Sequence, residues 1–221
     1  MVPRLAGLLV LAAASASQAQ GAKPFDWSGW TNPAPAIDVM AARHSQSKVL
    51  ERVIQRKVGV VASPFTHHPL SVTDLKPAKR GPTAGALAAS FRNLDAKERK
   101  EFAQMLDDGL TQTEGDPAFR KHNLAQAIAY LLAAAIWVLD DGEPVDEELG
   151  QVIAALNDIL GDDRAFRAMP AKDKQRLYEG AILTAGILTG LHSSAVSAQD
   201  EAAQTQLKQV ARATLARFGF K

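Results

Sequence analysis

The run from Leu124 to Leu139 constrains the fold more than any other feature of the chain. It contains sixteen residues, and Gln126 is the only strongly polar one among them. A helix that is apolar on every side has to be buried on every side, so other elements must surround it. At 1.5 Å per residue the helix would span about 24 Å, which is less than the hydrocarbon core of a bilayer. We therefore expect a central helix of a packed domain, with no stable insertion into a membrane.

Helical patterns continue on both sides of this run. Asp95 and Glu98 form a capping-box pattern at the start of one helix, and Asn123 can cap the central helix. The only candidate strand, at residues 58–62, has no evident partner strand. Apolar residues at three- and four-residue spacing predict an all-α fold, a single bundle of about six helices. These helices are expected over about residues 83–92, 95–113, 124–139, 144–160, 170–196 and 200–218.

The N-terminal part of the chain has a different pattern. Residues 1–19 hold Arg4, an uncharged apolar run and small residues before Gln20, which is typical of a cleaved signal peptide. Residues 20–82 are rich in proline and predict an extended basic arm with one short amphipathic helix, followed by the helical bundle over residues 83–221. This organisation predicts export to the periplasm or the extracellular medium.

Charge and composition exclude several classes of function. The arm carries nine Lys and Arg against four Asp and Glu, whereas residues 83–221 carry fifteen against twenty. Without Arg4 the charges of the chain balance, so we expect no general attraction to nucleic acid or to an anionic membrane. The chain has no cysteine, which excludes disulfides, thiol catalysis and thiolate metal ligands.

The sequence assigns no catalytic residue, no cofactor and no metal ion. Acidic pairs beside glycine lack the spacing of a calcium loop, so turns and helix ends are favoured over a cation site; the pairs are Asp107-Asp108, Asp140-Asp141 and Asp162-Asp163. The histidines lack the spacing of a helical zinc site and are expected in exposed loops; they are His44, His67, His68, His122 and His192. Glu179 stands among apolar residues and is expected to be partly buried; a position at the rim of the core or a structural hydrogen bond is favoured over a catalytic role.

Two further features favour packing over binding. Gly186 and Gly190 form a ridge of small residues, which predicts the close approach of a neighbouring helix. Trp27 and Trp30 lie in the arm, and we expect them to dock on the bundle rather than to bind a partner, because exposed tryptophan pairs promote association.

Four short stretches resemble a family of uncharacterised, secreted, all-helical bacterial proteins described only as a domain of unknown function. The stretches lie within about residues 123–220 and are His122 to Ala127, Asp173 to Gln175, Tyr178-Glu179 and Gly219-Phe220. The resemblance implies export and a helical fold. It brings no activity and no catalytic residue.

Three functions are compatible with these patterns. The first is an exported non-enzymatic helical protein, an interaction or structural module for an unknown protein or small ligand. The second is an enzyme of unrecognised class that uses carboxylates in a groove of the bundle. The third is a carrier of a small apolar ligand in a pocket between core helices. The absence of motifs favours the first.

Overall fold

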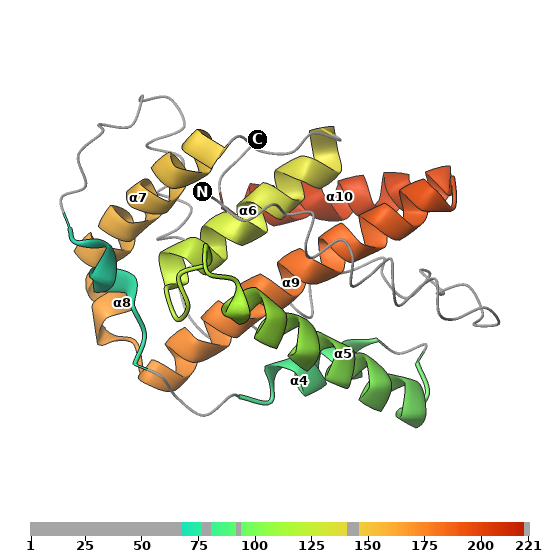
Figure 1. Cartoon of the computed structure of the whole chain (residues 1–221), viewed down its shortest axis with the longest axis horizontal. Helices are drawn as coiled ribbons and strands as arrows, with labels where there is room; N and C mark the ends of the chain where they lie inside the picture. The colour runs from blue at the N-terminus through green and yellow to red at the C-terminus, as the bar shows by residue number, and fades with distance from the viewer. Residues whose placement is uncertain (1–67, 77–80, 92–93, 141–145, 219–221) are drawn as a thin grey trace.

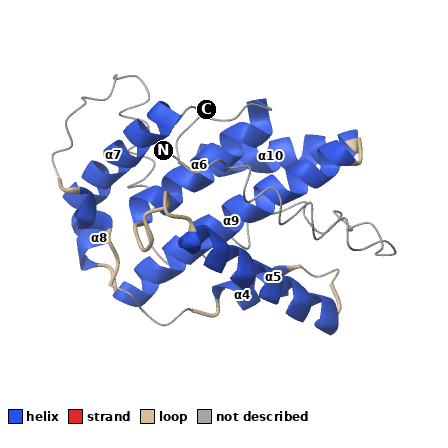
Figure 2. Cartoon of the chain, viewed as in Figure 1, coloured by secondary structure: helices blue, strands red, loops and turns tan. Residues whose placement is uncertain are grey.

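The computed structural model describes residues 68–76, 81–91, 94–140 and 146–218. Within these ranges the chain forms α-helices and one short 3-10 helix, and no strand (Figures 1 and 2). The predicted signal peptide, the arm helix, the candidate strand, the arm tryptophans and the Gly219-Phe220 helix end lie outside the described residues. The prediction of an all-α fold is confirmed.

Seven α-helices follow the 3-10 helix η2 (Leu70–Thr73) in the described part of the chain. They are α4 (Thr83–Ser90), α5 (Ala96–Gly115), α6 (Leu124–Asp140), α7 (Asp146–Asp162), α8 (Arg164–Ala168), α9 (Ala171–Ser197) and α10 (Glu201–Arg217). Six of them match predicted helices. The seventh, α8, has five residues and was not predicted, because one turn and a half is too short to show a period.

Local side-chain chemistry sets several helix starts. The Asp95 carboxylate accepts hydrogen bonds from the backbone N–H of Lys97 (2.7 Å) and Glu98 (2.8 Å), and Glu98 accepts one from the Asp95 N–H (2.7 Å). This is the predicted capping box of α5. Asn123 caps α6 by accepting from the N–H of Gln126 (2.9 Å), as predicted.

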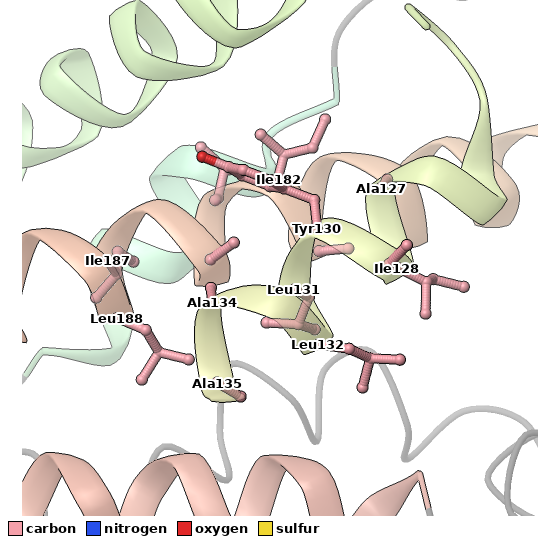
Figure 3. Close-up of a cluster of buried hydrophobic side chains, with 14 of the residues drawn as sticks. Ala127, Ile128, Tyr130, Leu131, Leu132, Ala134, Ala135, Ile182, Ile187 and Leu188 are labelled. Carbon is pink, nitrogen blue, oxygen red and sulfur yellow. The ribbon is translucent and has the colours of Figure 1, made fainter. Parts of the chain in front are cut away.

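Helix α6 lies at the centre of the fold. Twelve of its seventeen residues are buried, which confirms the core helix predicted from its apolar composition. It packs chiefly along α9, and α7 and α10 also pack against it. Side chains of α6 and α9, such as Leu131, Ala134, Ile182 and Leu188, meet in one cluster (Figure 3).

Helix α9 is the longest helix that the structure describes. Among the described helices it is the one long and apolar enough to cross a membrane by length and composition alone. Yet 67% of its most apolar stretch is buried inside the fold, as in the core helix of a soluble domain. Gly186 and Gly190 of this helix are both half-buried, and the close approach predicted for them stays a prediction.

Helices α4 and α5 form a pair that packs on α9, away from α7 and α8 (Figure 1). Phe91, which follows α4, meets Phe102 of α5 edge to face, with ring centroids 4.9 Å apart. The pair therefore covers one side of α9, while α6 and α10 cover others.

Tyr130 of α6 carries a buried hydroxyl that has no hydrogen-bond partner among the described residues. Burial raises the pKa of this hydroxyl, and the nearby Asp116 carboxylate adds to the rise. Tyr130→Phe removes an unpaired polar atom and keeps the ring against Phe119, so we expect unchanged or higher stability, by up to about 1 kcal/mol. Urea unfolding measures the difference.

Tyr178→Phe is the matched control, because the Tyr178 hydroxyl has two partners, the His122 N–H and the Glu114 carboxylate. It should destabilise by about 1–3 kcal/mol. Equal losses of stability in Tyr130→Phe and Tyr178→Phe would contradict the conclusion that the Tyr130 hydroxyl is unpaired.

Candidate functional site

Glu179 occupies the middle of α9 with its side chain inside the protein, where it is 1% exposed. Its Oε1 accepts hydrogen bonds from the Gly81 N–H (3.1 Å) and the Gln175 side-chain amide (3.0 Å). Its Oε2 accepts one from the Thr83 hydroxyl (2.5 Å). The predicted structural hydrogen bond is confirmed, and burial is more complete than expected.

These contacts attach the start of α4 to α9. The helix has no side-chain cap of its own, because its N-cap residue is Pro82. A Cβ atom at position 81 would lie 3.2 Å from Glu179 Oε2, so glycine lets the carboxylate approach the backbone closely. A carboxylate at a helix N-terminus is also favoured by the helix dipole. Glu179 therefore holds the residues at the start of α4 through the Gly81 N–H and the Thr83 hydroxyl.

The neighbouring Tyr178 organises a second polar group. Its hydroxyl accepts a hydrogen bond from the His122 N–H (3.1 Å) and donates one to Glu114 Oε1 (3.2 Å). Glu114 Oε2 also lies 3.5 Å from Lys121 Nζ, and the Glu114 side chain is only 6% exposed. Tyr178 thus joins α9 to the last turn of α5 and to the loop that precedes α6.

His122 has a left-handed backbone, with φ of 61°. Such a conformation is costly for histidine and persists only when the surroundings fix it. Here Tyr178 holds the His122 N–H, and the His122 carbonyl accepts from the Leu75 N–H (2.7 Å). The ring Nδ1 is buried without a hydrogen-bond partner among the described residues, 4.0 Å from Glu114 Oε1.

Residues 68–76, which we call the strap, are tied to α6 and α7 by buried amides. Asn157 of α7 donates to the carbonyls of His68 (3.3 Å) and Pro69 (3.2 Å) and accepts from the Thr73 hydroxyl (2.9 Å). Asn123 donates to the Leu70 carbonyl (3.0 Å), to Thr73 Oγ1 (2.9 Å) and to Asp74 Oδ1 (2.8 Å). The strap lies within the predicted arm, yet its polar groups are part of the packed domain.

The beginning of the strap also contacts the last turn of α7. The His68 N–H donates to Asp158 (3.0 Å), and its ring Nε2 lies 2.7 Å from Asp162 Oδ1. A Cβ atom on Gly161 would lie 2.7 Å from the His68 ring, so the glycine is needed for this approach. The sequence predicts that this helix ends near residue 160; Gly161 lies instead inside its last turn, and α7 ends at Asp162.

The other end of the strap is held by an ion pair between Asp74 and Arg120, with two parallel hydrogen bonds of 2.9 and 2.6 Å. The hydrogen bond from Arg120 lowers the pKa of Asp74 from its ordinary value of 3.8, although burial opposes the shift. Because the folded pKa is the lower one, the ion pair stabilises the fold above pH 3.8, and this contribution is lost as the pH falls toward the folded pKa.

Asp74→Asn should therefore reduce stability at neutral pH and flatten its acid dependence below about pH 4. Both side chains are more than one-third exposed, so the effect is expected to be small. Urea midpoints of the variant and the parent, compared at pH 7 and near pH 3, measure it. The exposed pair Lys97–Glu101 offers a control, since Lys97→Ala should change little at either pH. Parallel pH profiles of Asp74→Asn and the parent would contradict the prediction.

The structure corrects the exposed-loop prediction for His192. This residue lies on α9, is 3% exposed and packs edge-on against Trp137, with ring centroids 5.3 Å apart. The prediction was wrong because the apolar face of α9 extends to its last turns. His68 and His122 are partly exposed at loop positions, and His44 and His67 lie outside the described residues.

The acidic pairs have local structural roles. Asp107 and Asp108 lie inside α5 rather than in a turn, and Asp140 ends α6. Asp162 contacts His68, and Asp163 caps α8 through a hydrogen bond from the Phe166 N–H. Across the described ranges, no group of three or more His, Asp or Glu residues is placed to hold a metal ion.

Sequence reasoning missed Asn157, Thr73 and Glu114, which look like ordinary polar residues of a helix or loop. The sequence did hold one signal for other residues of these polar contacts, namely the short stretches that carry the family resemblance. His122, Asn123 and Gln126 come from the first stretch, and Gln175, Tyr178 and Glu179 from the next two, and all of them take part in these contacts. Three of the four stretches that carry the resemblance therefore meet around α9 and the start of α6.

The fold and these contacts define an all-α protein whose buried carboxylate, amide and phenol groups tie its helices together. The chain belongs to DUF6683, a family of unknown function, whose model matches residues 1–220. The predicted membership of a domain of unknown function is confirmed, and the match extends well beyond the predicted stretch. No curated protein and no solved structure matches the chain.

Proposed function

We propose that this chain is an exported, non-enzymatic module that acts by binding a partner. The observation that carries the proposal is that the side chains of Glu179 and Asn157, which are almost completely buried, are used within the chain. Both oxygens of Glu179 and the side-chain amide of Asn157 make hydrogen bonds that join separate elements. A catalytic carboxylate would need an oxygen within hydrogen-bond reach of a substrate. Because Glu179 and Asn157 use their polar atoms to hold the helices together, we favour binding of a partner at the surface over catalysis.

Export is the first part of the proposal, and it rests on the pattern of residues 1–19. We expect the mature protein to begin at Gln20 or within a few residues of it. N-terminal sequencing of the protein from the periplasmic and extracellular fractions of its host tests this. Recovery of intact Met1 in those fractions would overturn it.

Binding is the second part, and photo-crosslinking inside the host tests it. A photoreactive residue at Met105 of α5 or at Val196 of α9 would face the surroundings, because these side chains are 43% and 48% exposed. We expect a crosslinked product of discrete size from at least one of them. The same probe at Leu132, which is buried, is the control. Absence of a discrete product at every exposed position would contradict the binding role.

A second candidate function is acid–base catalysis by Glu114 and His122. The observation that favours it is the 4.0 Å separation of Glu114 Oε1 and His122 Nδ1 in a partly exposed corner with Lys121 nearby. A carboxylate beside one ring nitrogen can orient a histidine for proton transfer at the other. Incubating host envelope extracts with the parent and with His122→Gln tests this. A metabolite consumed by the parent alone would favour the enzyme over the binding module.

A further inference from the structure

Helix α7, at the edge of the fold, has an apolar side that is partly exposed (Figure 1). Its core side carries Leu156 and Leu160, which are 2% and 5% exposed, and a second side is held to the strap through Asn157. A third side carries an apolar row at the spacing i, i+3, i+7, which we call the α7 flank and which consists of Val152, Ala155 and Ile159. Val152 is 37% exposed, and the other two side chains are partly exposed.

The chain enters the described fold at the end of this helix. His68, the first described residue, contacts the last turns of α7 through Asp158 (3.0 Å) and Asp162 (2.7 Å). Residues 58–67 connect His68 to residues 47–57, where the sequence predicts a short amphipathic helix that lies outside the described residues. Ten residues can span up to about 33 Å, whereas the length of α7 is about 25 Å. Residues 47–57 are therefore tethered within reach of the whole α7 flank.

The composition of residues 47–57 complements the α7 flank. Their predicted apolar stripe consists of Val49, Leu50, Val53 and Ile54. Three cations repeat every four residues beside the stripe, and they are Lys48, Arg52 and Arg56. Six of the nine residues at positions 140–148, which lead into α7 and include its first turn, are acidic. An isolated helix as short as this one is marginal in water, so it needs an apolar surface to pack against.

We propose that residues 47–57 form an amphipathic helix that docks on the α7 flank, so that the occupant of this surface is the arm of the same chain. The apolar stripe covers the flank, and Lys48 and Arg52 lie toward the acidic start of α7. Exposed ion pairs contribute little, so the apolar contact supplies most of the affinity and the charges set the direction of the helix. The inference is independent of the proposed binding role, because it concerns a contact within one chain.

Paired cysteines test the docking in the full mature chain, because the chain has no cysteine of its own. Val53→Cys places a thiol in the apolar stripe, and Ala155→Cys places one in the middle of the α7 flank. Gly150→Cys is the matched control on α7, since position 150 is exposed and faces away from the flank, and a Cβ atom there would meet nothing within 4 Å. Gln55→Cys is the matched control on the arm, because it lies two residues from Val53 on the opposite side of the predicted helix.

A short bismaleimide reagent should join the Val53→Cys, Ala155→Cys pair within one molecule. Docking predicts that this pair reacts at least about tenfold faster than Val53→Cys with Gly150→Cys or Gln55→Cys with Ala155→Cys, because a tether alone gives neighbouring positions nearly the same effective concentration. Adding Leu50→Asp, which lies outside the packed bundle and puts a charge in the stripe, should lower the rate of the first pair to that of the controls.

Equal rates in the three pairs, or no product within one molecule from the first pair, would overturn the docking. A product that joins two molecules would also overturn it, because the occupant of the flank would then be a second copy. Circular dichroism of each variant checks that the helices are intact. If Ala155→Cys does not fold, Val152→Cys replaces it, because that position is more exposed and lies in the same row.

Discussion

Leu132→Asp is expected to abolish folding. Leu132 lies in the central helix α6 and is 3% exposed, so an aspartate there would be buried without a partner (Figure 3). Burying an unpaired charge costs several kcal/mol or more, comparable with the total stability of about 5–15 kcal/mol that a domain has. Circular dichroism and gel filtration of the purified variant measure the result.

Two further variants serve as comparisons for Leu132→Asp. Leu132→Ala keeps the site apolar and should cost about 2–5 kcal/mol while the fold persists. Val152→Asp introduces the same charge on α7, at a side chain that is 37% exposed, and should fold normally. A soluble Leu132→Asp protein with a helical spectrum and a cooperative melting transition would show that α6 is not central.

Asn157→Ala is expected to lower the free energy of unfolding by about 3 kcal/mol, because each buried polar group left unpaired costs about 1–3 kcal/mol. The side chain of Asn157 is fully buried. It accepts a hydrogen bond from the Thr73 hydroxyl and donates to the carbonyls of His68 and Pro69. Its loss would leave these strap groups without their partner on α7. Urea unfolding followed by circular dichroism measures the change.

The exposed amide of Gln104, which donates to Asp108 (2.9 Å), is the matched control. Gln104→Ala should change stability by no more than about 0.5 kcal/mol. Thr73→Val should be non-additive with Asn157→Ala, because the two residues share one hydrogen bond. Additive losses would mean that the strap is not held through Asn157.

Helix positions and caps could be predicted from the sequence because their causes are local. Asp95 and Asn123 act within three residues of their own positions, so a short pattern reveals them. The burial of α6 was predictable for a different reason, since its composition leaves no polar face. The helix predicted to end near residue 160 continues to Asp162, and Gly161 within it makes room for the His68 ring of the strap, which lies far away in sequence.

The polar contacts could not be predicted because they join residues that are distant along the chain. Glu179 and Gly81 are 98 residues apart, and Thr73 and Asn157 are 84 apart. No spacing rule connects such pairs, and each residue by itself resembles a solvated polar group. Sequence reasoning marked Glu179 as a partly buried acid from its apolar neighbours, but its contacts with Gly81 and Thr83 required the tertiary fold.

The strap has a consequence for the order in which the chain folds. Its partners on α7, which are Asn157, Asp158 and Asp162, follow it by 84 to 94 residues, so its contacts with α7 cannot form until α7 has formed. Closing a loop of that length costs entropy before any contact compensates, which favours late docking. Substitutions at Asn157 or Thr73 should then accelerate unfolding and leave the refolding rate nearly unchanged. The strap would thus set how long the folded protein lasts rather than how fast it forms.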